Sequence, residues 1–398
     1  MFVKYTEQRF LGLVIAFHMT AFVTLVWFLK RFEASMNLQP RNGSASISIN
    51  DLENHAQSRL AVHDGPLKKI LLWNDFYGKP DFGFGTGREP FQTAGCRVDA
   101  CVVTIDRHLY PLEELDALVW HTRSRDVSIP ERRSPHTRYV LVARESPGHN
   151  YSHFLDEIRG QRLAFNWSFS YTDDSEIRYP YGRVVRRETP LEPYLTDQNY
   201  AEGKTKLAAW FVSNCNTESK RENLAKSLQK WLTVDVYGNC GLYRCAQTHW
   251  RECHALLNAT YKFYLSFENS LCRDYVTEKF FTPLQLDVVP VVYGYANYSR
   301  LAPPHSYIDA LSFSTTKALA EYLLYLDKND TAYNEYFRWK PYYQQLTQHD
   351  LRAKAFCDLC ERLHYDREPR HHDINSWFDE DKQCLSQEDP RIKQLISE

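Results

Sequence analysis

The chain has 398 residues, of which 43% are hydrophobic and 14% aromatic. This is enough apolar material for two domains with cores of their own. A formal net charge of −2 provides no basic face for a nucleic acid, so nucleic-acid partners are excluded from the expected functions.

An uncharged stretch of 20 residues lies near the start, at positions 10–29. At ~1.5 Å per residue, a helix of this length reaches ~30 Å, the thickness of a bilayer's hydrocarbon core. A cleaved signal peptide is the alternative, but its apolar region usually covers only ~7–15 residues, and no clear small-x-small cleavage site follows here. We therefore expect a cytoplasmic tail at 1–9, a transmembrane signal anchor at 10–29 and a polar stem at 30–65.

Features beyond this stretch indicate on which side of the membrane the body lies. All ten cysteines follow the stretch, and their even number favours disulfides in an oxidising compartment. Candidate N-glycosylation sites of the form Asn-x-Ser/Thr occur at Asn42, Asn150, Asn166, Asn258, Asn297 and Asn329. Together these features predict a single-pass membrane protein with a lumenal C-terminal body.

Short apolar runs alternate with polar, helix-like segments from about residue 66. The runs at 70–73, 102–105, 118–120 and 139–143 predict the buried strands of a first parallel sheet. A second series follows at 207–213, 234–237, 262–267 and 288–293, with helical spacing of apolar residues in 219–232 and 316–326. The sequence therefore predicts an α/β fold with two doubly wound domains facing across a cleft, at 66–195 and 196–345, and a tail at 346–398 that packs back on them.

Polar residues gather where strands of the second series end. They follow a strand or open the next helix at Ser213, Asn214, Arg221, Tyr237, Glu268, Asn269, Tyr275, Glu278 and Lys279. Each position alone could be an ordinary turn or helix cap. Because parallel strands end at one edge of a sheet, and helix starts and cations bind phosphate, their coincidence predicts a pocket for a nucleotide diphosphate.

A carboxylate follows a strand of the first series. Glu145 stands between that strand and Pro147, which ends regular structure, so we expect it to face the cleft. A carboxylate in a cleft can act as a general base. On the residues alone, an idle exposed glutamate is the commoner use of such a position.

Two further patterns have competing interpretations. Gly83, Gly85 and Gly87 match neither phosphate-loop spacing, which favours a flexible loop. Cys357-x-x-Cys360, with His364, His371 and His372 nearby, could hold zinc, but an oxidising lumen favours disulfides. The Asp379-Glu-Asp381 sequence lies far from the expected cleft, so no metal site is predicted at the diphosphate.

Three segments resemble the donor-binding signature of the α-1,3-fucosyltransferases. They are Tyr264-Leu-Ser-Phe-Glu-Asn-Ser, Asp274-Tyr-Val-Thr-Glu-Lys279 and Val289-Pro-Val-Val292. Val103-Thr-Ile-Asp-Arg107, Arg144-Glu-Ser-Pro147 and Cys357-x-x-Cys360 extend the resemblance over nearly the whole body, from about 67 to 378. The resemblance implies an inverting Golgi enzyme of the GT-B architecture, with two Rossmann-like domains. The segment from Cys240 to Cys245 is similar to the invertebrate branches of the family.

The resemblance also implies a reaction. Fucose would pass from GDP-fucose to the 3-hydroxyl of an N-acetylglucosamine in a glycoprotein or oligosaccharide, either in the N-glycan core or in an antenna. Glu145 would be the general base in the acceptor domain, and Arg221 and Lys279 would stabilise the departing GDP. The other donor-pocket positions are Ser213, Asn214, Tyr237, Glu268, Asn269, Tyr275 and Glu278, the last holding sugar hydroxyls.

The remaining implications concern cofactors, disulfides and location. No cofactor is required, although Mn²⁺ could stimulate the reaction. Cys96 and Cys101 would be bridged to Cys357 and Cys360, and the protein would lie in the membrane of Golgi cisternae as a type II protein. Thr282, Pro283 and Asp287 depart from the family pattern. They motivate an alternative function, a catalytically silent lumenal protein that binds glycans or nucleotides.

Overall fold

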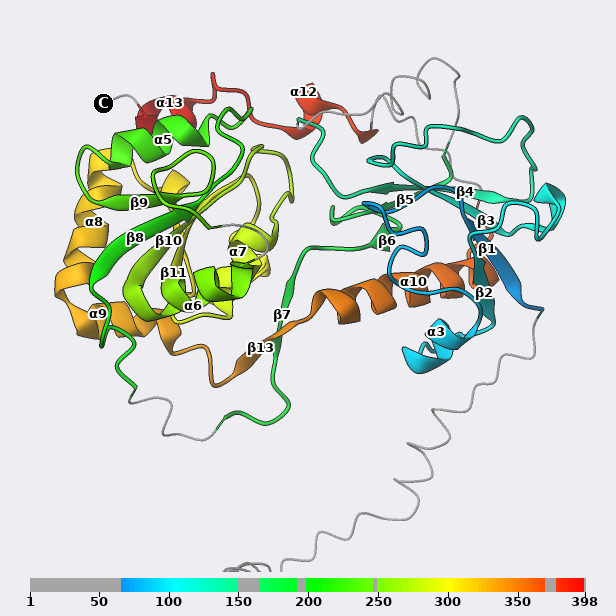
Figure 1. Ribbon diagram of the computed structural model, residues 1–398, viewed down its shortest axis with the longest axis horizontal. Helices are drawn as coiled ribbons and strands as arrows, with labels where there is room; N and C mark the ends of the chain where they lie inside the picture. Colours follow the sequence, from blue (N-terminus) through cyan, green and yellow to red (C-terminus); the bar gives the residue numbers. More distant parts are fainter. Residues whose placement is uncertain (1–65, 149–164, 192–197, 246–248, 369–376, 397–398) are drawn as a thin grey trace, which may run out of the picture. The chain divides into compact units, whose positions relative to one another are not determined.

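The computed structural model describes residues 66–148, 165–191, 198–245, 249–368 and 377–396 (Figure 1). The expected anchor and stem lie outside these residues, as do Asn42 and Asn150. Within the described part, no helix is both long and apolar enough to cross a membrane.

The first sheet has six strands, all parallel to their neighbours, in the order β2-β1-β3-β4-β5-β6. They are β1 (Lys68–Leu72), β2 (Cys101–Thr104), β3 (Ala117–His121), β4 (Arg138–Ala143), β5 (Trp167–Ser170) and β6 (Ile177–Arg178). The four predicted strands are confirmed, and β5 and β6 extend the sheet beyond the prediction. We call this sheet and the segments that cover it the first lobe.

A helix from the far end of the chain covers one face of the first sheet (Figure 1). It is α10 (Gln348–Tyr365), whose Leu351, Phe356 and Leu359 pack against the strands. The opposite face buries Leu71 and other residues of alternate position, together with Phe378. Among the described residues that connect the strands of this sheet, only α3 (Glu89–Thr93) and η1 (Leu112–Glu114) are helical. The helical cover expected within 66–195 is thus supplied on this face by residues 348–365.

The second sheet has five parallel strands in the order β12-β11-β10-β8-β9. They are β8 (Lys206–Phe211), β9 (Val234–Tyr237), β10 (Tyr261–Phe267), β11 (Val289–Tyr293) and β12 (Ile308–Asp309). The four predicted strands are again confirmed. We call this sheet and its helices the second lobe.

Helices cover both faces of the second sheet. One face packs against α5 (Arg221–Leu228) and α8 (Thr316–Lys328), whose Leu224, Leu228, Leu319 and Leu323 are fully buried. The other face packs against α6 (Trp250–Thr260) and α7 (Glu278–Leu284). The doubly wound prediction therefore holds for this sheet. Shorter described elements are η4 (Tyr298–Arg300), η5 (Ala310–Ser312), α9 (Asp330–Asn334), η6 (Glu335–Phe337) and α12 (Glu380–Gln383).

The chain passes repeatedly between the lobes. β7 (Arg183–Arg186), which leaves the first lobe, pairs antiparallel with β13 (Tyr343–Leu346), which returns to it (Figure 1). After α10, the last helix α13 (Pro390–Ile396) buries Ile392 and Leu395 in the core of the second lobe. The tail thus packs on both lobes and links them.

All ten cysteines form disulfides. The bonds are Cys96–Cys357, Cys101–Cys360, Cys215–Cys240, Cys245–Cys253 and Cys272–Cys384. The first two join the cysteines that the resemblance brought together, and they attach α10 to the first lobe. They also argue against the zinc alternative, because Cys357 and Cys360 no longer offer thiolates. His364 Nε2 instead lies 3.0 Å from the carbonyl oxygen of Ala100. His371 and His372 lie outside the described residues.

Removing these two bonds should destabilise the protein in a non-additive way. They span 261 and 259 residues, but while one is intact the other closes only a short additional loop. Loop entropy therefore predicts a loss of about 8 kcal/mol in the free energy of unfolding when all four cysteines become alanine, about 5.5 for the long loop and about 2.5 for the short one. Either pair alone should cost only about 2.5 kcal/mol, well under half of the total. Urea unfolding of the two double variants and the quadruple variant measures the difference, and simple additivity would contradict the loop argument.

The structure changes the expectation for one glycosylation site. Asn166 is only 8% exposed, and its Oδ1 accepts a 2.8 Å hydrogen bond from the backbone N–H of Tyr139. This burial disfavours a glycan on Asn166 in the folded protein, and glycosylation of the site stays a prediction. Asn258 lies within α6 and Asn329 caps α9, whereas Asn297 is exposed. Asn297 thus presents its amide most openly among the described sites.

Candidate active site

A cavity of about 740 Å³ lies where the strand ends of the two lobes meet. Side chains from the first lobe line it with those of the second lobe, as expected at the carboxyl ends of parallel strands. Of the predicted residues, the cavity brings together Glu145, Ser213, Asn214, Arg221, Tyr237, Asn269, Tyr275, Glu278 and Lys279. The remaining predicted residue, Glu268, does not line the cavity. It is completely buried beneath the start of α7.

Two tyrosines hold the carboxylate of Glu145. The hydroxyl of Tyr77 donates to Oε1 and that of Tyr275 donates to Oε2, each at 2.9 Å. Burial raises the pKa of Tyr275 and, although Tyr77 is half-exposed, also that of Tyr77, and the negative charge of Glu145 adds to the effect on both. Both phenols therefore stay protonated as donors at neutral pH. Because Tyr77 belongs to the first lobe and Tyr275 to the second, the carboxylate is fixed where the lobes meet.

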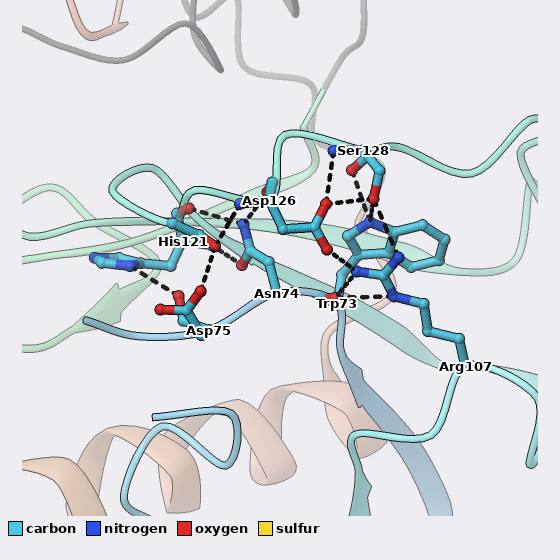
Figure 2. A network of polar contacts seen from close by, with 8 residues as sticks. Trp73, Asn74, Asp75, Arg107, His121, Asp126 and Ser128 are labelled. Carbon is cyan, nitrogen blue, oxygen red and sulfur yellow. Dashed lines mark hydrogen bonds and ion pairs between the residues drawn. The ribbon is translucent and has the colours of Figure 1, made fainter. Parts of the chain in front are cut away.

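Tyr77 follows a polar network that includes Asn74, Asp75 and His121, which Figure 2 labels. Asn74 donates to the carbonyl oxygen of His121 at 3.0 Å and accepts from the N–H of His121 at 2.8 Å, which ties the loop after β1 to β3. Asp75 accepts from Ser124 and from the N–H of Gly78, closing a turn around Tyr77. Tyr77 has φ +50°, a left-handed conformation, and its ring packs edge-on against His121. Sequence reasoning missed Tyr77, although the Asp75-to-Gly78 turn was a local signal for a tight bend.

His121 should make the protein sensitive to mild acid. Burial lowers the pKa of His121 to about 3, against an ordinary value of 6.5. The unfolded chain therefore binds a proton below pH 6.5 that the folded chain does not bind. The contribution of neutral His121 to the free energy of unfolding is therefore fully present above this pH and is lost as the pH falls toward 3. Between pH 7 and 5 the free energy of unfolding should drop by about 2 kcal/mol because of this group. Urea unfolding at the two pH values checks this, and His121→Gln should remove that part of the pH dependence. An unchanged dependence in the variant would contradict the assignment.

Arg221 lies below the strand ends of the second lobe. Its Nη1 donates to the carbonyl oxygen of Phe267 at 2.7 Å and its Nη2 to that of Asn214 at 3.3 Å. The residue is 4% exposed, and Nε has no acceptor among the described residues. Burial lowers the pKa of Arg221, but a guanidinium remains charged at neutral pH. The two carbonyls thus hold a cation in the wall of the cavity.

The start of α7 places a second cation, Lys279, in the wall of the cavity. Thr277 caps the helix, and buried Glu268 accepts from the N–H and the hydroxyl of Thr277 at 2.7 and 3.0 Å. Lys279 Nζ lies 3.4 Å from Glu268 and 3.1 Å from Glu278. Burial opposes the charged form of Lys279, but these two carboxylates outweigh burial and raise its pKa. Glu268 therefore supports Thr277 and Lys279 from below, while Glu278 and Lys279 face the cavity.

Aromatic rings form another wall. Tyr237 contacts Phe211 edge-on, and Phe211 contacts Tyr264 in the same way, with ring centroids 5.1 and 5.4 Å apart. The hydroxyl of Tyr237 lies 2.8 Å from that of Tyr261, which donates to Asp235 at 2.6 Å. This chain of bonds fixes the ring of Tyr237. A rigid aromatic wall next to two cations suits a planar base that carries phosphates.

The departures from the family pattern leave the helix intact. Thr282 and Pro283 line the cavity, and Pro283 lies in the last turn of α7, which ends at Leu284. A proline there affects only the end of the helix. Asp287 lies outside the cavity and pairs with Lys340 at 2.6 Å.

A fixed carboxylate, two cations and an aromatic wall are the groups that a transferase for a nucleotide-linked sugar requires. Comparison with known proteins agrees. Residues 65–182 match the family model for the N-terminal region of fucosyltransferases, and residues 201–377 match that for the C-terminal region of glycosyltransferase family 10 (fucosyltransferase). The chain therefore belongs to glycosyltransferase family 10, the fucosyltransferases, and the resemblance read from the motifs is confirmed.

Two relatives in Drosophila melanogaster support the same assignment. The chain is 36% identical over 355 residues to α-(1,3)-fucosyltransferase C of Drosophila melanogaster, covering 82% of this chain and 81% of the relative. It is 38% identical to glycoprotein 3-α-L-fucosyltransferase A of the same organism, covering 79% of this chain and 61% of that protein. Among solved structures, it is similar to a crystal structure of an α1,3-fucosyltransferase with GDP-fucose, at 15% identity and a TM-score of 0.48, covering 79% and 95% of the two chains.

Proposed function

We propose that this protein transfers fucose from GDP-fucose, with inversion, to the 3-hydroxyl of an N-acetylglucosamine in glycoprotein glycans. The observation that carries the proposal is the carboxylate of Glu145, held at both oxygens by Tyr77 and Tyr275 in the same cavity as Arg221 and Lys279. Family membership supports the choice of fucose as the transferred sugar.

In this mechanism the two lobes have separate tasks, as in the GT-B architecture. The first lobe, with its domain placed at 66–195, binds the acceptor, and the domain at 196–345 binds GDP-fucose. Glu145 removes the proton from the acceptor hydroxyl as that oxygen attacks C1 of fucose from the face opposite GDP. The C1–O bond to the diphosphate breaks, and its electron pair leaves with GDP.

The second lobe stabilises the departing GDP. Arg221 and Lys279 face the negative charge that grows on the diphosphate, and fixed cations of this kind need no reorganisation during the reaction. The ring of Tyr237 supports the base, and Glu278 accepts from the hydroxyls of fucose. Ser213, Asn214 and Asn269 supply the remaining polar contacts to the donor. These groups act without a required cofactor, and Mn²⁺ would serve only as a stimulant.

The cell-biological part of the proposal follows from the sequence. We place the protein in Golgi cisternae as a type II membrane protein, anchored by residues 10–29 with a lumenal body. The five disulfides agree with an oxidising compartment.

Incubation of the full chain in detergent with GDP-fucose and a panel of N-glycans tests the proposal. We expect fucosylated products by mass spectrometry, with the fucose on the 3-hydroxyl by NMR. The panel should include core chitobiose and antennal N-acetylglucosamine acceptors, which also distinguishes the two acceptor classes. Tight binding of GDP without transfer to any glycan would overturn the proposal and favour the silent binding protein.

A further inference from the structure

Arg144 is a buried cation that forms no ion pair with any described residue. It follows β4 directly, precedes Glu145 and lines the cavity, yet is only 4% exposed. Its Nε and Nη1 are sealed from solvent and have no hydrogen-bond acceptor in the described part of the chain. Because a buried charge without a partner is costly, a group of this kind indicates a missing acceptor.

The surroundings of Arg144 hold its guanidinium in place. The rings of Tyr179 and Tyr181 lie 3.8 and 4.0 Å from its central carbon, on cation–π geometry. The hydroxyl of Tyr181 also donates to the carbonyl oxygen of Arg144. These contacts orient the cation but supply no oxygen to its N–H groups.

A second arginine, Arg352, contacts Tyr179 as well. Arg352 of α10 lines the cavity, and its Nε donates to the hydroxyl of Tyr179 at 3.2 Å. Its Nη1 donates to the carbonyl oxygen of Gly83 at 2.8 Å, and the described residues contain no carboxylate paired with it. Two guanidinium groups therefore share one end of the cavity, around Tyr179.

We propose that Arg144, assisted by Arg352, binds an anionic substituent of the acceptor glycan, a carboxylate or a sulfate ester. This inference rests on the proposed function and specifies its acceptor class. A guanidinium presents planar paired donors that match either anion. Phe76, Tyr77, Tyr179 and Tyr181 give the same end of the cavity apolar ring faces for the sugar that carries the anion.

The location favours the acceptor over the donor phosphates as the source of the anion. Arg144, Arg352 and Tyr179 belong to the first lobe, next to the base Glu145. The second lobe already supplies Arg221 and Lys279 for a diphosphate. An anion on the acceptor would also neutralise the buried guanidinium only when the correct substrate is bound.

Acceptor kinetics with the full chain test the inference. The probes are a neutral galactosyl-N-acetylglucosamine oligosaccharide and the same oligosaccharide carrying either a sulfate ester or a sialic acid. We expect kcat/KM to favour at least one acidic form over the neutral form by tenfold or more. Whichever form is favoured identifies the anion. Arg144→Met should reduce this preference roughly tenfold to a hundredfold, and Arg144→Lys should retain part of it.

Arg138→Met is the matched control. Arg138 also lies on β4 and covers an aromatic ring, that of Trp167, but it does not line the cavity, so its loss should leave the preference unchanged. A natural chain that does not prefer either acidic acceptor would overturn the inference. In Arg144→Met, an equal loss of kcat/KM on all three acceptors would also overturn the inference. A loss of GDP affinity as large as the loss of kcat/KM would do the same. If that variant does not fold, Arg352→Met should lower the preference several-fold, and no change would count against the proposal.

Calorimetric binding of the three oligosaccharides separates this inference from the proposed function. If the protein transfers no fucose at all but binds an acidic oligosaccharide more tightly than the neutral one through Arg144, only the proposed reaction fails. If fucose is transferred and the three bind equally, only the present inference fails.

Discussion

Replacing Glu145 by glutamine is expected to lower kcat roughly 10²- to 10⁴-fold, the usual contribution of a general base. The side chain keeps its size, but an amide cannot take the proton from the acceptor hydroxyl. GDP affinity should remain nearly unchanged, because Glu145 belongs to the first lobe and the cations for GDP belong to the second. Steady-state kinetics and calorimetry with GDP measure the two quantities.

The control for this variant is Glu321→Gln on α8, whose carboxylate is 66% exposed and lies outside the cavity. Its kinetics should match those of the natural chain. A loss of GDP binding in Glu145→Gln would mean that the carboxylate organises the donor site instead of serving the acceptor. Retention of most of kcat would show that another group takes the proton.

The strands were predictable because parallel strands are buried on both faces. β3, β4 and β11 therefore appear in the sequence as continuous apolar runs. β5 was not predicted from the sequence because Ser168 and Ser170 interrupt its apolar residues. Both serines are buried, with Ser168 bonded to Glu176 and Ser170 to a carbonyl of β4. Such partners are visible only in the folded chain.

The packing partners of α10 could not be predicted from a local sequence pattern. Thr347 and Asp350 form a capping box that marks the start of the helix. Nothing nearby indicates that Leu351 and Phe356 pack against strands more than 170 residues earlier in the sequence. The cysteines are the long-range signal, and their pairing came from a family resemblance rather than from spacing.

The candidate site likewise contains some residues that the local sequence could predict and others that it could not. Arg221 and Lys279 could be predicted because strand ends in a parallel sheet lie together. Glu268 shows the limit of this rule, since a residue one step beyond a strand can point into the cavity or under the next helix. Tyr77 and Arg144 depend on contacts with Glu145, Tyr179 and the network in Figure 2, which no local spacing reveals.

The second large effect is expected for Lys279→Met, which should raise the dissociation constant of GDP roughly tenfold to a hundredfold. A charge-assisted hydrogen bond contributes about 1.5–3 kcal/mol, and the variant loses one to the diphosphate. The loss should lie toward the upper end, because the carboxylate of Glu278 then faces the diphosphate without its cation, with the charge of Glu268 buried behind it. Calorimetry at low and high salt measures it, with exposed Lys317→Met on α8 as the control.

The same substitution should also destabilise the fold, because Glu268 is fully buried and Lys279 is its nearby cation. A double variant separates the two effects. Glu268→Gln keeps an oxygen for Thr277 while removing the buried charge, so adding it to Lys279→Met should recover much of the free energy of unfolding. GDP affinity should stay low, since no cation returns to the cavity. If the double variant regained GDP affinity, Lys279 would serve to hold α7 in place, and Arg221 would carry the charge of the leaving diphosphate alone.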